Sequence, residues 1–112
     1  MAPEKIERVL FNLVTNALRH TPSDGSVAVN VARRDEDVLV SVEDTGAGLE
    51  PEALGRMFER FWRADRARSA AGMGLGLAIA RGLVEAHGGM IWAENRAQGG
   101  ARVSFTLPAA RT

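Results

Sequence analysis

The sequence contains no cysteine and no tyrosine, and its formal net charge is zero. Without cysteine, the chain can form no disulfide and offers no thiolate ligand to a metal. Because 14 basic residues balance 14 acidic ones, the whole chain exerts no long-range attraction on nucleic acid or on an anionic membrane. We therefore expect neither nucleic-acid binding nor direct membrane contact.

Long hydrophobic runs are also missing. No apolar stretch approaches the roughly 18 residues of a membrane-spanning helix, and the N-terminal residues 1–4 lack the apolar core of a signal peptide. A length of 112 residues suits one domain with a single core. We expect residues 1–112 to form a soluble domain, and its parent protein could be longer and membrane-bound.

The first half of the chain predicts a helix followed by a hairpin. Apolar residues recur at helical spacing between Pro3 and about His20, and the turn-forming residues 21–25 end this helix. Valines then alternate over residues 27–31 and again over 38–42, with a charged link at 33–37. This pattern predicts an antiparallel hairpin with one buried face.

The second half predicts two helices and two strands. A short helix is expected from Pro51 to about Phe61, and a second one over residues 75–87, ended by Gly88-Gly89. Strands are expected over residues 90–95 and 103–107, with Pro108 closing the last one. The elements predict an α/β two-layer sandwich, in which about three helices cover one face of a mostly antiparallel mixed sheet.

Three alternate glycines, Gly72, Gly74 and Gly76, precede the predicted helix 75–87. Main-chain N–H groups of such a loop, together with the positive end of the helix dipole, form a cradle for phosphate. Leu77 stands where a dinucleotide fingerprint would need a further glycine, and no P-loop is present. A flexible loop without a ligand remains the alternative.

Two asparagines mark one side of the first predicted helix. Asn12 and Asn16 are four residues apart, with Arg19 and His20 one turn further along the same stripe. Amide oxygens suit Mg²⁺, which takes one or two protein ligands when it is bound to a nucleotide. The alternative is that both amides bind nearby loop backbone.

A carboxylate followed by two glycines ends the second predicted strand. Asp44 can accept a hydrogen bond from an exocyclic amine such as that of adenine, and Gly46 and Gly48 would let a flat ring approach the main chain. Ordinary turn chemistry, with Asp before Gly, is the competing interpretation.

Residues 56–68 carry five arginines against two acidic residues. Arginines on a mobile segment can close over a polyphosphate and neutralise the charge that develops on its γ-phosphoryl group. For each single arginine a solvated surface position is the alternative. His87, at a helix end beside Gly88-Gly89, is expected to be structural.

Taken in order, these segments resemble the catalytic and ATP-binding domain of a bacterial sensor histidine kinase, of the Bergerat-fold (GHKL) ATPase superfamily. Residues 12–22 resemble the N box, 44–48 the G1 box, 58–63 the F box and 72–77 the G2 box of that family. The closing segments 87–89 and 105–108 are similar as well. The resemblance covers nearly the whole chain.

The resemblance implies a function and a set of site residues. The domain would bind Mg-ATP and donate the γ-phosphoryl group to a histidine in a two-component phosphorelay. Asn16 would ligate Mg²⁺ with support from Asn12, Asp44 would bind the adenine amine, and Arg63 would assist transfer from an ATP lid at about 49–72. The implied nucleotide site comprises Asn12, Asn16, Arg19, His20, Asp44, Gly46, Gly48, Arg63, Arg68, Gly72, Gly74, Leu75, Gly76 and Leu77.

The chain lacks two segments that the family pattern contains. It starts almost at the first helix, where the family has a short strand segment, and the phosphoacceptor helix with its histidine is absent. We therefore expect a monomeric fragment that acts in trans on a separate phosphoacceptor domain, with a response regulator downstream.

Position 12 separates transfer from hydrolysis. Gyrase-type ATPases of the same superfamily carry a glutamate there, which activates water as a general base. Asn12 is an amide and takes no proton at neutral pH, which favours a histidine kinase. A non-catalytic ATP-sensing module and an anti-sigma-factor serine kinase remain the alternatives.

Overall fold

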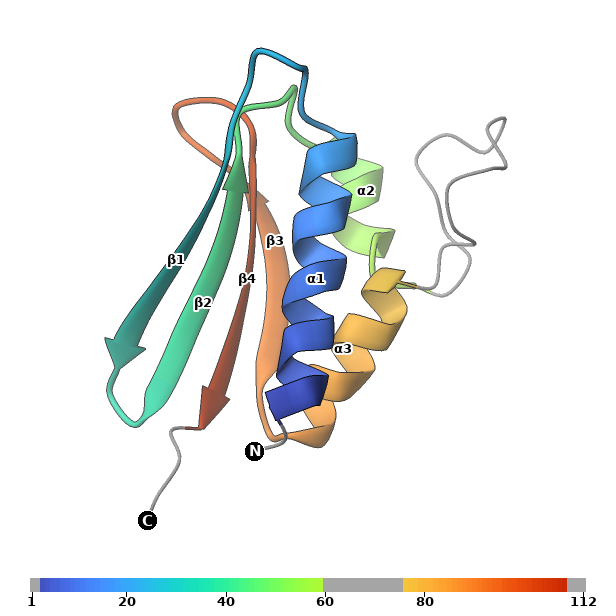
Figure 1. Ribbon diagram of the computed structural model, residues 1–112. Coiled ribbons are helices and arrows are strands. Elements are labelled where there is room, and N and C mark those ends of the chain that lie inside the picture. The colour runs from blue at the N-terminus through green and yellow to red at the C-terminus, as the bar shows by residue number, and fades with distance from the viewer. Residues whose placement is uncertain (1–2, 60–75, 109–112) are drawn as a thin grey trace.

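The computed structural model describes residues 3–59 and 76–108 (Figure 1). Helices in this part of the chain are α1 (Pro3–Arg19), α2 (Pro51–Arg56) and α3 (Gly76–Ala86). Strands are β1 (Val27–Arg34), β2 (Asp37–Asp44), β3 (Met90–Asn95) and β4 (Ala101–Pro108). The helices lie on one side of the sheet, so the predicted α/β two-layer sandwich is confirmed.

The four strands pair in the order β1-β2-β4-β3, and every pair is antiparallel. Val42 lies opposite Val103, and Val40 opposite Phe105. All four of these side chains are buried, so this face of the two central strands meets the helices. Residues that alternate with them, such as Glu43 and Arg102, therefore lie on the opposite face.

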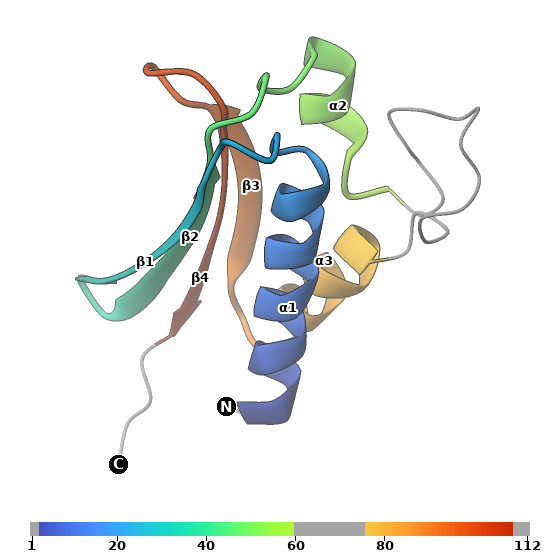
Figure 2. The ribbon, with the colours of Figure 1, turned by 45° about the horizontal axis from the view of Figure 1, so that its top comes forward.

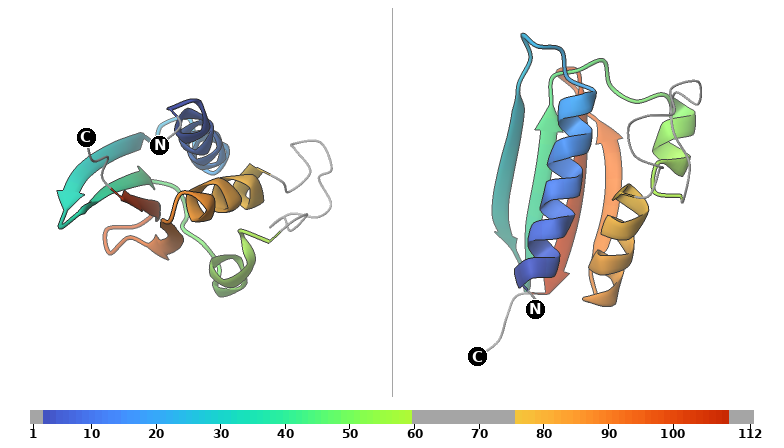
Figure 3. Two further views of the ribbon diagram at one scale, coloured as in Figure 1. Left: turned by 90° about the horizontal axis from the view of Figure 1, so that it is seen from below. Right: turned by 45° about the vertical axis from the view of Figure 1, so that its right-hand side comes forward.

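Helix α1 forms because its apolar residues fall on one stripe. Val9, Leu13 and Ala17 are buried against the sheet and α3, while Glu4 and Arg19 suit the dipole at the first and last turns. Thr21 Oγ1 donates to the carbonyl of Ala17 at 2.6 Å and caps the C-terminal end. The two long helices lie side by side on the sheet (Figure 3).

The predicted buried face of the hairpin is wrong for its first strand. β1 pairs with β2 as expected, but Val29 is 42% exposed and Val31 is 69% exposed. β1 is an edge strand, and α1 packs mainly over β2 (Figure 3, right). Val29 and Val31 lie on the helical side of the sheet without a helix covering them, whereas Val27 packs against the core.

Two boundaries differ from the predictions. Both strands of the hairpin run further into the charged link, so only Asp35 and Glu36 form the turn, with Asp35 at φ 55°. Helix α2 ends at Arg56 rather than near Phe61, because residues 57–59 form a turn that directs Met57 and Phe58 toward the core. In the described ranges no helix combines the length and hydropathy of a membrane span.

Candidate functional site

The asparagine stripe of α1 faces the start of α3. Asn12 Nδ2 donates a hydrogen bond to the carbonyl oxygen of Gly76 at 3.0 Å. Asn16 follows one helical turn later and is half-buried. Asn12 therefore lies beside the N-terminal end of α3, and its amide binds backbone there, as the alternative interpretation had it.

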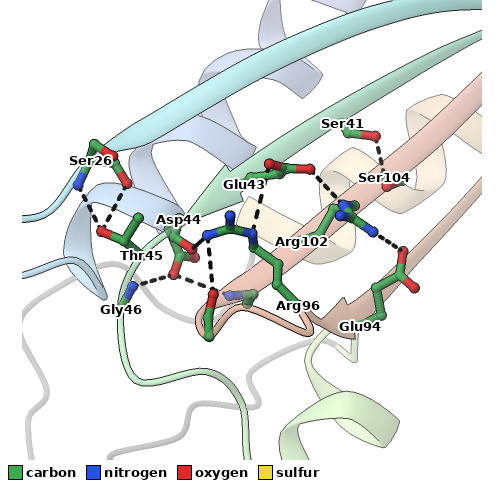
Figure 4. Close-up of polar contacts among 12 residues, drawn as sticks. Ser26, Ser41, Glu43, Asp44, Thr45, Gly46, Glu94, Arg96, Arg102 and Ser104 are labelled. Atoms are coloured by element: carbon green, nitrogen blue, oxygen red, sulfur yellow. Dashed lines mark hydrogen bonds and ion pairs between the residues drawn. The ribbon is translucent and has the colours of Figure 1, made fainter.

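Asp44 closes β2 and is 6% exposed. Its Oδ1 accepts hydrogen bonds from the main-chain N–H groups of Gly46 at 2.9 Å and Ala101 at 3.3 Å (Figure 4). Both bonds end on Oδ1, and no residue of the described chain donates a hydrogen bond to Oδ2. The turn interpretation is thus correct for one carboxylate oxygen, while the other is left to accept a donor.

The loop after Asp44 is held against the end of α1. A Cβ on Gly46 would lie 2.2 Å from the carbonyl oxygen of His20, so only glycine permits this approach. On the far side of the loop, Asn95 Oδ1 accepts from Leu49 N at 2.7 Å, and Asn95 Nδ2 donates to Leu49 O at 3.0 Å. Figure 2 shows this loop, the end of α1 and the β3–β4 turn at the same end of the sheet.

The first turn of α3 carries no acidic side chain. Gly76 is exposed, and Leu77 is half-buried with its side chain packed against the core. The first four main-chain N–H groups of α3, which have no partner within the helix, and the positive end of the helix dipole are therefore not opposed by a carboxylate on the same turn.

Behind Asp44, on the face opposite the helices, four charged side chains alternate in sign. Arg102 Nε donates to Glu43 Oε2 at 2.7 Å, and Arg102 Nη1 lies 3.4 Å from Glu94 Oε2. Arg96 Nε lies 3.8 Å from Glu43 Oε1. The hydrogen bond to Glu43 raises the pKa of the Arg102 guanidinium above its ordinary value.

Among the predicted site residues, Asn12 contacts Gly76, and Gly46 contacts Asp44 and closely approaches His20, whereas other predicted residues are not described. The described ones are Asn12, Asn16, Arg19, His20, Asp44, Gly46, Gly48, Gly76 and Leu77. Predictions for Arg63, Arg68, Gly72, Gly74 and Leu75 lie outside the described residues, as does most of the arginine-rich segment. Arg56, at the start of that segment, pairs instead with Glu52 and Glu59 on α2 and the following turn.

Sequence reasoning missed the residues that hold Asp44 and its loop from behind. Asn95, Arg96 and Ala101 contact residues 44–49 from the β3–β4 region. Their only local sequence signal is the Gly99-Gly100 pair, which is typical of a turn but does not indicate what the turn packs against.

Comparison with known proteins identifies the family. Residues 1–111 match the family HATPase_c, described as histidine kinase-, DNA gyrase B-, and HSP90-like ATPase. The chain belongs to the HATPase_c family. Sensor histidine kinase WalK of Bacillus subtilis is 42% identical over 109 residues, which cover 94% of this chain but 18% of WalK. This HATPase_c chain thus spans less than a fifth of the length of that relative.

Solved structures agree with this assignment. The mycobacterial sensor histidine kinase MprB superposes with a TM-score of 0.87 at 31% identity, covering 100% of this chain and 77% of that one. Full-length ShkA, solved in complex with AMPPNP, superposes with a TM-score of 0.83 at 35% identity, covering 96% of this chain and 22% of ShkA. The HATPase_c fold of these kinases and of this chain is the same.

Proposed function

We propose that this chain binds Mg-ATP and donates the γ-phosphoryl group to a histidine of a separate phosphoacceptor domain. It would be the cytoplasmic catalytic and ATP-binding domain of a two-component kinase that is anchored in the inner membrane, with a response regulator as the next acceptor. The observation that carries the proposal is the carboxylate of Asp44, in which Oδ1 accepts two main-chain hydrogen bonds and Oδ2 accepts none from the described chain. The contact between Asn12 of α1 and Gly76 of α3 supports it. The ShkA complex with AMPPNP supports it, because that related chain holds an ATP analogue.

Asp44 would select the base. With Oδ1 fixed by two main-chain N–H groups, Oδ2 is an acceptor held in one orientation. It fits the 6-amino group of adenine, which donates, and does not fit the 6-oxo group of guanine, which accepts. A buried acceptor facing another acceptor is costly, so the site should discriminate between the two bases.

Asn16 and the first turn of α3 would hold the phosphate end. An amide oxygen is a ligand that Mg²⁺ accepts, and the remaining positions of the ion are filled by phosphate oxygens and water. Unopposed N–H groups at the start of α3 suit the triphosphate. A bound Mg²⁺ would neutralise charge on the β- and γ-phosphates, and Asn12 would support Asn16 from the preceding turn.

Transfer itself would need little from the chain beyond positioning. The lone pair of a neutral imidazole nitrogen forms the N–P bond as the bond from the γ-phosphorus to its bridging oxygen breaks, and that electron pair leaves with ADP. Arg63 and Arg68, from the lid segment 49–72, would neutralise charge on the transferred group. Because Asn12 is not a base, water is not activated in competition with the histidine.

The test of the base-binding role uses Asp44→Asn, with Asp44→Ala beside it. In Asp44→Asn the amide oxygen takes the place of Oδ1, and the NH₂ group points where Oδ2 was, so a donor replaces the acceptor. We expect the wild-type chain to prefer Mg-ATP over Mg-GTP in calorimetry, and both variants to lose that preference. Equal affinity of the wild type for both nucleotides would contradict the assignment of Asp44.

The test of the transfer role mixes the chain with γ-labelled ATP and a dimerisation domain that carries an acceptor histidine. Acid-labile, base-stable label on the acceptor is expected only when chain, ATP and Mg²⁺ are all present. Binding of ATP without any phosphohistidine would favour the ATP-sensing alternative instead.

A further inference from the structure

One arginine connects the charged residues on the far face of the sheet with Asp44. Glu43, Arg102 and Glu94 are direct cross-strand neighbours on the sheet face away from the helices. Arg96 follows β3 by one residue and ion-pairs with Glu43, which places its guanidinium beside this row (Figure 4). Its side chain is only 16% exposed.

From there Arg96 holds two main-chain carbonyls at once. Nη1 donates to the carbonyl oxygen of Asp44 at 3.0 Å and to that of Gly99 at 3.1 Å. Its own main-chain N–H donates to Gly100 O at 2.8 Å. One guanidinium therefore joins the end of β2 to the β3–β4 turn.

The same turn supplies the donor that fixes the Asp44 carboxylate. Ala101 lies opposite Asp44, one position beyond the last ladder pair Glu43↔Arg102, and gives its N–H to Oδ1. Gly100, at φ 85°, brings the turn so close that a Cβ there would lie 1.9 Å from the carbonyl oxygen of Asp44. The direction of the carboxylate thus depends on how tightly the turn is held.

We propose that Arg96 is a positioning residue for adenine recognition: it ties the main chain of Asp44 to the β3–β4 turn and so aims Oδ2 at the 6-amino group. This rests on the proposed role of Asp44 in binding the base. Arg96 would touch neither the nucleotide nor the phosphoacceptor, and it acts through Asp44 alone.

The chemistry of the contact suits arginine in particular. A guanidinium offers five donors in a fixed plane, so one group can serve two carbonyls while facing a carboxylate. Glu43 compensates the charge of Arg96 at 3.8 Å, which allows the guanidinium to be mostly buried. Loss of Arg96 would leave the buried Asp44 carbonyl without this donor and would release the turn.

Arg102 provides a matched control. It belongs to the same charged row and pairs with Glu43 and Glu94, but it makes no contact with Asp44. Arg102→Ala removes an equal charge from the network and leaves both carbonyl contacts of Arg96 in place.

The experiment measures the contribution of the 6-amino group directly. Mg-ATP and the Mg complex of purine riboside triphosphate, which lacks that group, are titrated by calorimetry into wild type, Arg96→Ala and Arg102→Ala. We expect Arg96→Ala to bind ATP about tenfold more weakly, with purine riboside triphosphate almost unchanged. Arg102→Ala should retain the wild-type ratio of the two affinities.

A purely structural role gives a different result. In that case Arg96→Ala would unfold at a lower urea concentration, but the folded protein would keep the wild-type ratio of affinities for ATP and purine riboside triphosphate. That result would overturn the proposal. If Arg96→Ala does not fold, Arg96→Lys is measured instead, because its shorter side chain keeps a charge beside Glu43 and should lose discrimination in the same direction. A wild type that binds neither nucleotide would refute the proposed function, whereas a discriminating wild type with an equally discriminating variant would refute only the role of Arg96.

Discussion

Asn12 is the residue whose substitution tests whether this chain transfers phosphate or hydrolyses ATP. Its amide donates to Gly76 O at 3.0 Å, so it joins α1 to the start of α3 as well as lying beside the proposed magnesium ligand. A carboxylate at this position could take a proton from water, which an amide cannot.

We therefore expect Asn12→Glu to raise steady ATP hydrolysis above that of the wild type, since general-base catalysis contributes roughly 10²–10⁴-fold. Asn12→Gln is the matched control, because glutamine has the length of glutamate but no basic oxygen. Phosphate release is measured under saturating Mg-ATP for all three proteins. Equal rates for Asn12→Glu and Asn12→Gln would remove the argument that position 12 separates transfer from hydrolysis.

Asn16 is expected to account for the effect of magnesium on nucleotide affinity. Removing its amide in Asn16→Ala should abolish the gain in ATP affinity that Mg²⁺ gives the wild type, because the ion then keeps only phosphate and water ligands. The measurement is ATP binding with Mg²⁺ and with EDTA. Asn30→Ala, at an exposed position of β1, should keep the wild-type gain, and an undiminished gain in Asn16→Ala would exclude Asn16 as the ligand.

At this scale the sequence is informative where the partners are close along the chain. Asn12 and Asn16 are only four residues apart on one helix. Asp44 and Gly46 are two residues apart and hydrogen-bond to each other, as a turn requires. Arg96 and Ala101 reach Asp44 across 52 and 57 residues. Those contacts depend on the register of β4 with β2, which no local pattern specifies.

Among the elements, α3 carries a glycine that its geometry does not require. Gly82 lies inside the helix, and a Cβ there would meet nothing within 4 Å. Gly82→Ala should stabilise the chain by about 0.5–1 kcal/mol, the usual difference between the two residues in a helix. Gly89→Ala is the contrast, since its Cβ would lie 1.8 Å from Thr106 O, and it should destabilise in the same urea titration. A loss of stability in Gly82→Ala would contradict this account of α3.

The two valine strands give a paired test of burial. Val42 and Val31 lie on the same face of the hairpin, but Val42 is 2% exposed and Val31 is 69% exposed. Val42→Thr buries a hydroxyl in an apolar core and should cost about 1–3 kcal/mol. Val31→Thr should change the free energy of unfolding by less than about 0.5 kcal/mol. Similar losses in both variants would mean that β1 is covered in solution.

The same comparison shows what alternation can predict. Alternate valines specify a strand with one apolar face, and both strands form as expected. Whether that face is buried depends on the place of the strand in the sheet and on which strand the helix crosses. β1 is at the edge and β2 is beneath α1, a distinction that only the packed structure makes.

Across the whole molecule, the fold gathers segments that are distant in the sequence. The proposed site draws on a helix, the end of a strand and the start of another helix, at residues 12–16, 44–48 and 76–77. The β3–β4 turn lies at the end of the sheet where β2 finishes. The chain has no net charge, so any attraction for a triphosphate must arise from local groups, such as main-chain donors, the arginines of the proposed lid and a bound cation, rather than from a global field.

Nucleotide binding at such a site should be visible in the stability of the entire chain. A ligand that binds only the folded state adds about 2.7 kcal/mol when its free concentration is 100 times Kd, so Mg-ATP should raise the urea midpoint of the wild type in a concentration-dependent way. Asp44→Asn keeps an acceptor for the N–H groups of Gly46 and Ala101, and its midpoint without nucleotide should stay close to that of the wild type. At the same Mg-ATP concentration its midpoint should rise much less, because a misplaced donor now faces the adenine amine. An equal rise in both proteins would mean that nucleotide stabilises the chain without using Asp44, and the base would then have to be recognised elsewhere.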